Sequence, residues 1–285
     1  MVTSFNPLEA FIYDEGFVRL STVKYSTAPE DIDNLFIHLT NSSIQCKNTD
    51  ALPDSQARST WDANDRDHPM SKASEDEKGG TKLSLAYLWR RLRETLSEDA
   101  IVALKQSIHE VIVKSLVCVE DAIPNQINSF ELFGYDILID RQLKPWLIEV
   151  NSSPSMGIDN DLDRRIKGTL IDDTLRLIDP LPCDRVALMR VLERRVEELR
   201  VNRLRPYNST TVVGSAAHRH QLNRDLTDIL RGRKPRVHGE LPRNMGGFKR
   251  LAPGSSAFHA ANKLKRECRA SQRRPGAAVR TLHKS

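Results

Sequence analysis

The sequence predicts an α+β fold, because strand-like and helix-like segments alternate along its first 180 residues. Residues 130–151 contain two apolar runs joined by the polar turn 140–144, which predicts a β-hairpin. Residues 161–178 carry apolar side chains at helical spacing, which predicts an amphipathic helix beside it. Strands interrupted by packed helices are typical of one mixed domain.

The remaining elements follow from local signals. Ser97 precedes two acids, as the N-cap of a helix does, and Pro124 is expected to end that helix. A stretch rich in Ser, Asp and Pro predicts a surface loop. In chain order we expect two strands within residues 2–25 around a turn at 14–16, a short strand and loop at 36–44, the polar loop at 46–81, helices at 82–96 and from Ser97, the hairpin, and helices at 161–178 and 184–204.

The hairpin carries the strongest candidate site. Side chains alternate along a strand, so Glu149 and Asn151 should share a face. If Asp140 pairs with Pro145, Asp136 lies opposite Glu149. Two carboxylates and an amide oxygen are hard ligands that suit Mg²⁺ beside a phosphate. The alternative is an exposed sheet face with ordinary acids; the apolar neighbours, which suggest a buried strand, favour the metal site.

Three motifs carry a family resemblance. Residues 136–155 read D-I-L-I-D-R-Q-L-K-P-W-L-I-E-V-N-S-S-P-S, residues 16–26 read G-F-V-R-L-S-T-V-K-Y-S, and residues 38–45 read H-L-T-N-S-S-I-Q. Together they resemble the tubulin–tyrosine-ligase-like family, which consists of ATP-grasp ligases that modify tubulin tails. The hairpin motif is more similar to the polyglutamylase branch than to the tyrosine ligase. The resemblance implies the C-terminal part of an ATP-grasp domain.

The resemblance also implies roles for individual residues, with ATP and Mg²⁺ as cofactors. An ATP-grasp ligase transfers the γ-phosphoryl group of ATP to a carboxylate, and an amine then attacks the acylphosphate. Cations and metal would stabilise the charge on the phosphoryl oxygens. The implied assignments are Asp136, Glu149 and Asn151 as Mg²⁺ ligands, Arg19 and Lys24 as catalytic cations, and Thr40, Asn41 and Ile148 as nucleotide or amino-acid contacts.

The start of the chain departs from the family pattern. Residues 1–11 resemble the middle of a strand pair that a K-F-D-x-R motif and an N-terminal half precede in the family. That half supplies the lysines that hold the ATP phosphates. We therefore expect a truncated chain or a natural fragment, which by itself should bind ATP poorly.

Charge is distributed unevenly and suggests three regions. Residues 1–180 hold 19 Lys and Arg against 30 Asp and Glu, whereas residues 181–285 hold 24 against 8. We expect a partial ligase domain at 1–181, a basic amphipathic helix at 182–205 and a mostly disordered basic tail at 206–285, in which only residues 222–230 suggest a short helix. The helix could bind an acidic surface such as a microtubule, or dock on the domain for stability alone. The tail could equally be solvated without a partner.

Other classes of protein fit less well. The four cysteines form no C-x-x-C pair, the N-terminus has no signal-peptide pattern, and no apolar run is long enough to cross a bilayer. The pI of about 9.0 would allow nucleic-acid binding, but no recognition motif accompanies it, so nucleic acid and membrane are not expected partners. The expected location is the cytoplasm and cytoskeleton, including cilium, flagellum or basal body.

The leading hypothesis is therefore an ATP-dependent ligase that adds free glutamate to glutamate side chains of tubulin tails. A glycine or tyrosine ligase of the same family is the alternative within this class. An inactive fragment that binds microtubules through its basic helix is the alternative from another class. The motifs do not decide which amino acid is added or which tubulin is preferred.

Overall fold

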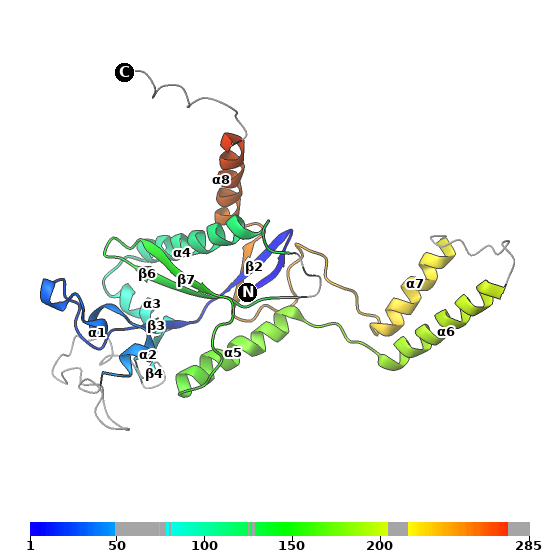
Figure 1. Ribbon diagram of the computed structural model, residues 1–285, viewed down its shortest axis with the longest axis horizontal. Coiled ribbons are helices and arrows are strands. Elements are labelled where there is room, and N and C mark those ends of the chain that lie inside the picture. Colours follow the sequence, from blue (N-terminus) through cyan, green and yellow to red (C-terminus); the bar gives the residue numbers. More distant parts are fainter. Residues whose placement is uncertain are drawn as a thin grey trace, which may run out of the picture. The chain divides into compact units, whose positions relative to one another are not determined.

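The computed structural model describes residues 1–48, 74, 78–79, 81–124, 126, 129–204 and 216–272, and Figure 1 shows their helices and strands. The chain divides into two compact units. One consists of Met1–Leu177 together with Asn244–Ser285, and the other of Ile178–Arg243. Residues after Arg243 thus belong with the first unit, although the sequence suggests that they continue a tail.

The first sheet contains β1 (Val2–Phe5), β2 (Leu8–Tyr13) and β8 (Phe248–Ala252), with antiparallel β2 in the middle. Its partner β8 comes from a distant part of the chain. Together with β3 (Phe17–Arg19), residues 2–25 hold three strands rather than the two expected. Asn6 and Pro7 form an extra turn, which splits the first expected strand into two.

A second sheet has the order β3, β5 (Lys82–Ser84), β4 (Lys78–Gly79). The helix expected at 82–96 is shorter, because its first residues form β5 and α3 spans Leu85–Arg93. The Ser84 side chain accepts a hydrogen bond from the Tyr87 amide at 3.1 Å and thereby caps α3. Most of the polar loop expected at 46–81 lies outside the described residues.

The strand expected within 36–44 is wrong. The 3₁₀ turn Pro29–Asp31 is followed by two short helices, α1 (Leu35–His38) and α2 (Ser42–Gln45). Asn34 and Asn41 each cap one of them by accepting a backbone amide hydrogen bond. Side-chain caps of this kind favour helix starts over an extended strand.

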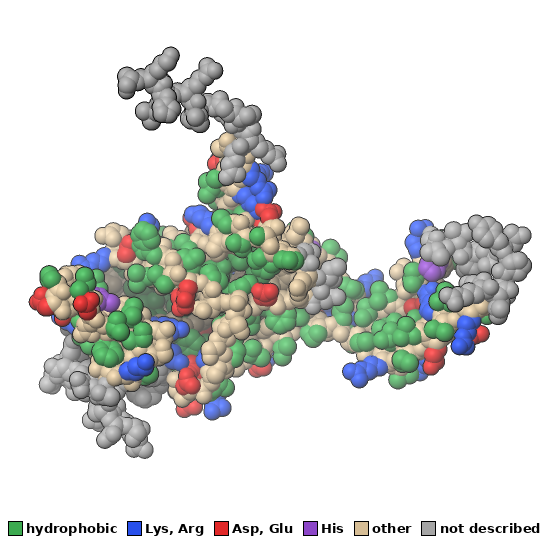
Figure 2. Space-filling view, viewed as in Figure 1, with side chains coloured by type: hydrophobic (Ala, Val, Ile, Leu, Met, Phe, Trp, Pro, Cys, Tyr) green, Lys and Arg blue, Asp and Glu red, His purple; other side chains and the backbone are tan. Residues whose placement is uncertain are grey.

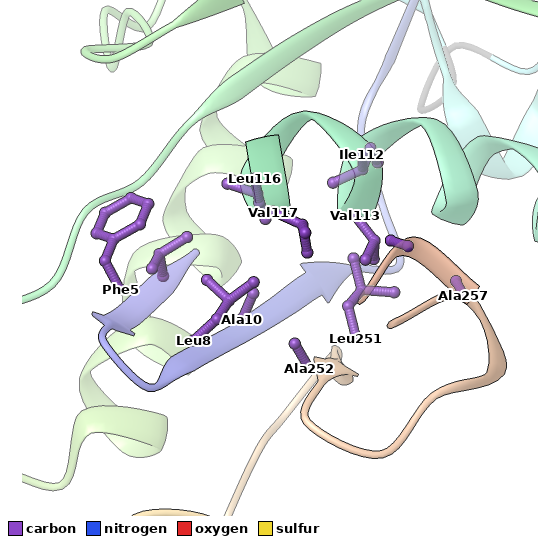
Figure 3. Packing of buried hydrophobic residues seen from close by; sticks show 12 residues of the cluster. Phe5, Leu8, Ala10, Ile112, Val113, Leu116, Val117, Leu251, Ala252 and Ala257 are labelled. Atoms are coloured by element: carbon purple, nitrogen blue, oxygen red, sulfur yellow. The ribbon is translucent and has the colours of Figure 1, made fainter. Parts of the chain in front are cut away.

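Helix α4 (Glu98–Val119) provides one wall of the main core, and Ser97 caps it as expected by accepting from the Ala100 amide at 3.2 Å. The helix ends at Val119, before the expected Pro124. Apolar side chains from α4, β1, β2, β8 and α8 (Ser256–Gln272) pack together (Figure 3). The buried members of this cluster are Val2, Phe5, Leu8, Ala10, Ile112, Val113, Leu116, Val117, Leu251, Ala252, Ala257 and Ala261.

The expectation that residues 206–285 are mostly disordered is wrong for β8 and α8. The short helix suggested at 222–230 is present as part of the longer α7 (Ala216–Ile229). Helix α8 packs against α4 and buries only small residues, Ala257 and Ala261. Because small residues give little apolar periodicity, the sequence pattern missed this helix. Strand β8 is stabilised by pairing with β2, which a local pattern does not reveal.

Helix α5 spans Asp161–Ile178, as the sequence predicts. Near its end, buried Asp173 accepts hydrogen bonds from the Gly247 amide at 2.9 Å and from Tyr13 Oη at 3.2 Å. Gly246, at φ +52°, lies so close to Asp173 that an added Cβ would overlap the Asp173 carboxylate. This carboxylate therefore fixes the segment before β8 against α5.

The second unit contains α6 (Arg185–Leu204) and α7. Asp225 of α7 is buried and accepts hydrogen bonds from Arg194, Arg195 and Gln221. The expected basic helix is present, but its apolar stripe does not face α7. Figure 2 shows hydrophobic side chains exposed along α6, and the stripe residues are between 48% and 64% exposed: Val186, Met189, Leu192, Val196 and Leu199.

Two further features concern the described residues as a whole. None of their helices is long and apolar enough to cross a membrane. All four cysteines are free and exposed: Cys46, Cys118, Cys183 and Cys268.

Leu251→Ala should destabilise the first unit by about 2–5 kcal/mol, because it leaves a cavity where β8 meets the core. Leu251 is 3% exposed, whereas Leu264 on α8 is 51% exposed, so Leu264→Ala is the matched control and should change stability by less than about 0.5 kcal/mol. Urea unfolding measures both. Equal midpoints for the two variants would contradict the placement of β8 in the core.

Candidate functional site

The candidate site is built on the hairpin of β6 (Gly134–Ile139) and β7 (Pro145–Asn151). Asp136 lies directly opposite Glu149, as the sequence predicts. The register that leads there differs, because Ile139 rather than Asp140 pairs with Pro145. Ile137 of β6 pairs with Leu147, but the next residue, Asp136, pairs with Glu149. Ile148 is therefore left without a partner on β6 and is the extra residue of a β-bulge. The bulge restores the predicted acid pair.

The hairpin is more exposed than its apolar sequence suggests. Tyr135 and Ile137 pack against the main core, whereas Leu138 and Trp146 are 58% and 47% exposed. Within β7, every residue from Trp146 to Asn151 is exposed. The expectation of a buried strand is therefore wrong.

The three predicted ligand residues lie together. Asn151 Nδ2 donates to Glu149 Oε1 at 3.1 Å. Burial raises the pKa of the Asp136 carboxyl above its ordinary value, the charge of Arg19 opposes this, and the facing Glu149 adds to it. A raised pKa means that the carboxylate form of Asp136 lacks compensating positive charge.

This donor set fits a hard divalent cation. Two facing carboxylates and an amide oxygen are the ligand types that Mg²⁺ takes, and a cation between them would relieve their repulsion. Among the described residues there is no group of three or more His, Cys, Asp or Glu side chains that could hold a metal. The hairpin would have to rely on two acids and one amide, with water and substrate oxygens completing the shell.

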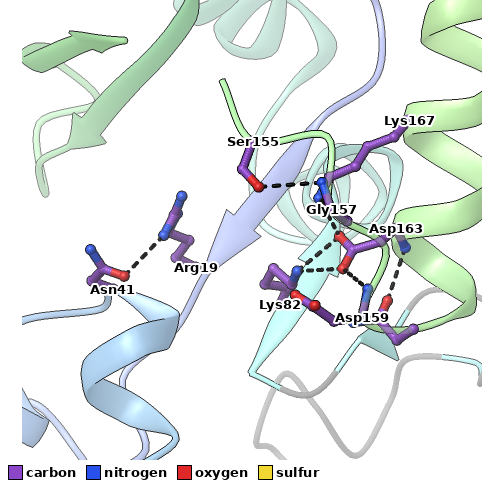
Figure 4. A network of polar contacts seen from close by, with 9 residues as sticks. Arg19, Asn41, Lys82, Ser155, Gly157, Asp159, Asp163 and Lys167 are labelled. Carbon is purple, nitrogen blue, oxygen red and sulfur yellow. Dashed lines mark hydrogen bonds and ion pairs between the residues drawn. The ribbon is translucent and has the colours of Figure 1, made fainter. Parts of the chain in front are cut away.

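Arg19 at the end of β3 connects this hairpin to the loop between α1 and α2. Its Nη1 donates to Asn41 Oδ1 at 3.5 Å (Figure 4), and its charge acts on Asp136. Asn41 also accepts from the amide and hydroxyl of Ser43 at 3.1 and 3.0 Å. Thr40 precedes Asn41 and is half-buried. Arg19, Asn41 and Asp136 thus belong to one neighbourhood.

Two predicted residues have weaker connections to it. The Lys24 side chain is exposed and forms no ion pair with a described residue. Ile148 is the bulge residue between Leu147 and Glu149, and its side chain is 63% exposed.

Sequence reasoning missed a buried residue that holds the Arg19 and Asn41 segments together. Gln45 is 0% exposed. Its Oε1 accepts from the amide and hydroxyl of Thr22 at 2.7 and 2.5 Å, and its Nε2 donates to the carbonyl oxygens of Phe36 and Leu39 at 3.1 and 2.5 Å. The motif at 38–45 includes this glutamine, but a polar residue gives no sequence signal that it will be buried.

Glu149→Gln should lower the pKa of Asp136, because it removes the facing negative charge while Arg19 remains. Asp136 binds its proton more tightly in the folded state than in the unfolded state. The contribution of Asp136 to the unfolding free energy therefore falls as the pH rises from 3.8, the ordinary aspartate pKa, through the raised pKa of the folded state. NMR titration of the Asp136 carboxyl carbon measures the shift. Glu110→Gln on α4 is the control and should change nothing; an unchanged Asp136 pKa in Glu149→Gln would contradict the facing pair.

Comparison with known proteins identifies the family. The model of the tubulin-tyrosine ligase family matches residues 1–68 and 62–187. Tubulin polyglutamylase TTLL5 of Homo sapiens is 31% identical over 288 residues, covering 90% of this chain and 21% of that protein. Tubulin polyglutamylase ttll6 of Danio rerio is 31% identical over 292 residues, covering 95% of this chain and 34% of that protein.

A third relative is similar over a shorter range. Tubulin monoglutamylase TTLL4 of Mus musculus is 36% identical over 185 residues, which are 62% of this chain and 14% of that protein. The chain spans about a third or less of the length of each of these three relatives. Since the family match extends over more than half of the residues, the chain belongs to the tubulin-tyrosine ligase family.

Proposed function

We propose that the chain is part of an ATP-dependent ligase that adds glutamate to glutamate side chains in tubulin C-terminal tails through an acylphosphate. The observation that supports this most directly is the facing pair Asp136 and Glu149 with Asn151 beside it and Arg19 near Asp136. The names of the relatives, which are tubulin polyglutamylases and a monoglutamylase, support the substrate class.

Each residue of the site has a proposed task. Asp136, Glu149 and Asn151 would hold Mg²⁺, which neutralises charge on the nucleotide phosphates. The Arg19 guanidinium would bind the phosphoryl group or the carboxylate that accepts it, because its planar fork suits both anions. Asn41 would orient Arg19 through its side-chain oxygen. Thr40 and Ile148 would contact the nucleotide or the incoming amino acid, and Lys24 would attract the acidic tail.

Glu149→Gln should reduce ligase activity at least about 100-fold, because it removes one ligand charge at nearly constant shape. The assay measures transfer of labelled glutamate to purified tubulin by the full-length protein. Glu110→Gln should keep wild-type activity. Full activity of Glu149→Gln would exclude Glu149 from the site, and incorporation of labelled glycine or tyrosine instead of glutamate would favour the corresponding ligase.

Asp140 would be a poor control in that assay, although it lies at the hairpin turn. Its carboxylate accepts hydrogen bonds from Trp146 Nε1 at 2.8 Å and from the amides of Gln142 and Lys144 at 2.9 Å. The bond from Trp146 and those from the amides hold the pKa of Asp140 below its usual range. Asp140→Asn would therefore weaken the turn itself.

Microtubule binding by the second unit is the alternative function, and its positive charge favours it. Residues 178–243 hold 14 Lys and Arg against 8 Asp and Glu. Arg194 and Arg195 are engaged by buried Asp225, so they are less available to an acidic partner. Arg190 and Arg200 on α6 are exposed and would provide the contact.

Replacing Arg190 and Arg200 by glutamate should lower microtubule co-sedimentation, with an effect that shrinks as salt screens the charges. The melting temperature should stay unchanged, because neither side chain is buried. Arg194→Glu is the contrasting variant and should unfold the α6–α7 pair by placing two negative charges together at Asp225. Equal pelleting of wild type and the double variant, on normal microtubules and on microtubules without acidic tails, would exclude this role.

A further inference from the structure

The loop that follows Asn151 is held by one carboxylate outside the proposed ligand set. Asp163, in the first turn of α5, is 0% exposed. Lys82 Nζ donates to both of its oxygens at 2.8 Å, and the Asp159 amide donates to Oδ2 at 3.2 Å. Lys167 Nζ lies 3.4 Å from Oδ1. Figure 4 shows these contacts converging on Asp163.

One arm of this network leads to Arg19. Lys82 lies in β5 directly opposite Arg19 of β3. Both Lys82 and Lys167 lie over the ring of Phe17, at 5.2 and 5.7 Å from its centroid. The strand that carries Arg19 is therefore fixed to Asp163 through its neighbouring strand and through its own Phe17.

The other arm leads to the hairpin. Residues 152–160 connect the end of β7 at Asn151 to α5. Within this connection, the Asp159 amide donates to Asp163, and Lys167 donates to the Gly157 carbonyl oxygen. The Gly157 amide donates to Ser155 Oγ at 3.3 Å. The loop is thus attached at two points to the network that holds β5.

A helix-capping role alone does not account for this arrangement. The α5 start already has Asn160, whose Oδ1 accepts from the Asp163 amide at 2.9 Å. Buried ion pairs are often no more stabilising than an apolar replacement, and what they supply in some proteins is a defined geometry. Here the carboxylate joins a strand, a loop and a helix that are separate in sequence.

We propose that Asp163 is a positioning residue, which sets the distance between Arg19 and the Asn151 end of the metal-binding hairpin. This inference rests on the proposed function, because it assumes that the hairpin binds a divalent cation. Asp163 touches neither the cation nor the substrate. It acts through Lys82 on one side and through residues 152–160 on the other.

The chain offers a matched control on the same helix. Asp173 is also buried, at 4% exposed, and also accepts a backbone amide and side-chain donors. Its partners Gly247 and Tyr13 belong to segments without proposed site residues. Asp163→Asn and Asp173→Asn therefore remove the same charge from two similar networks, only one of which leads to the hairpin.

The experiment compares these two variants with wild type in the complete 285-residue chain. Mn²⁺ serves as the probe, and its binding is measured from paramagnetic broadening of the amide NMR signals of the hairpin. Asp163→Asn should weaken Mn²⁺ binding about 10-fold or more, as changes to groups that orient metal ligands do, whereas Asp173→Asn should stay within about twofold. Equal weakening by both variants would show that Asp163 is only structural.

Amide hydrogen exchange separates this proposal from the proposed function. Asp163→Asn should speed exchange at Asp159 and Asn151 at least about tenfold, while Asp173→Asn should leave both unchanged. If wild type does not bind Mn²⁺, the metal assignment of the hairpin fails, and the exchange result alone then decides whether Asp163 holds the loop. Unchanged exchange at Asn151 in Asp163→Asn would overturn the positioning role.

Lys82→Met keeps the test decisive if Asp163→Asn does not fold. It removes only the β5 arm and leaves Lys167 and the Asp159 amide on the carboxylate. Exchange at Leu20, whose amide donates to the Thr81 carbonyl oxygen at 3.4 Å beside the Arg19–Lys82 pair, should become faster, while the amide of Asp159 should remain protected. Loss of protection at Asp159 to the same extent as at Leu20 would mean that the two arms are not separate, which would contradict the proposal.

Discussion

Packing of α4 against the β1–β2–β8 sheet is the interaction on which the first unit depends. Val113 and Val117 are almost fully buried there, and so are Ala10 of β2 and Ala252 of β8. Because apolar burial is the main favourable contribution to folding, this core holds together the elements that share it. The hairpin joins it through Tyr135 and Ile137, and the loops around the site are fixed by other means.

Those other means are buried polar groups, each of which joins segments that are distant in sequence. Asp163 joins α5 to β5, Asp173 joins α5 to the segment before β8, and Asp225 joins α7 to α6. Burial raises the pKa of Asp163, but the hydrogen bonds from Lys82 and from the Asp159 amide outweigh it and keep this pKa below its usual range. Such groups are costly to leave without partners, so loss of one donor would disturb the local geometry more than loss of an exposed ion pair.

The site contrasts with these satisfied networks. Asp136 faces another acid, and its pKa is raised rather than lowered. A carboxyl group with unfavourable surroundings is typical of positions that bind a cation or substrate, because function rather than stability selects them. The exposed Leu138 and Ile148 on the same hairpin are likewise unfavourable for an isolated domain.

The sequence by itself determined the elements whose signals are local. Helix α5 and the cap at Ser97 follow from periodicity and capping chemistry. The sequence also predicts the hairpin and its polar turn, but strand alternation from the observed Ile139–Pro145 pair would place Asp136 opposite Ile148, so the facing of Asp136 and Glu149 needs the bulge. The family could also be inferred from sequence, because its motifs are contiguous stretches. These features need no knowledge of what the segments pack against.

Only the tertiary structure decided the rest, because the deciding interactions join residues far apart in the chain. The pairing of β8 with β2 and the packing of α8 on α4 bring residues 244–272 into the first unit. The bulge at Ile148 depends on how the two strands fit together, and the burial of Gln45 and Asp163 depends on partners 23 and 81 residues away. A polar residue becomes a structural centre only when folding removes it from water and supplies those partners.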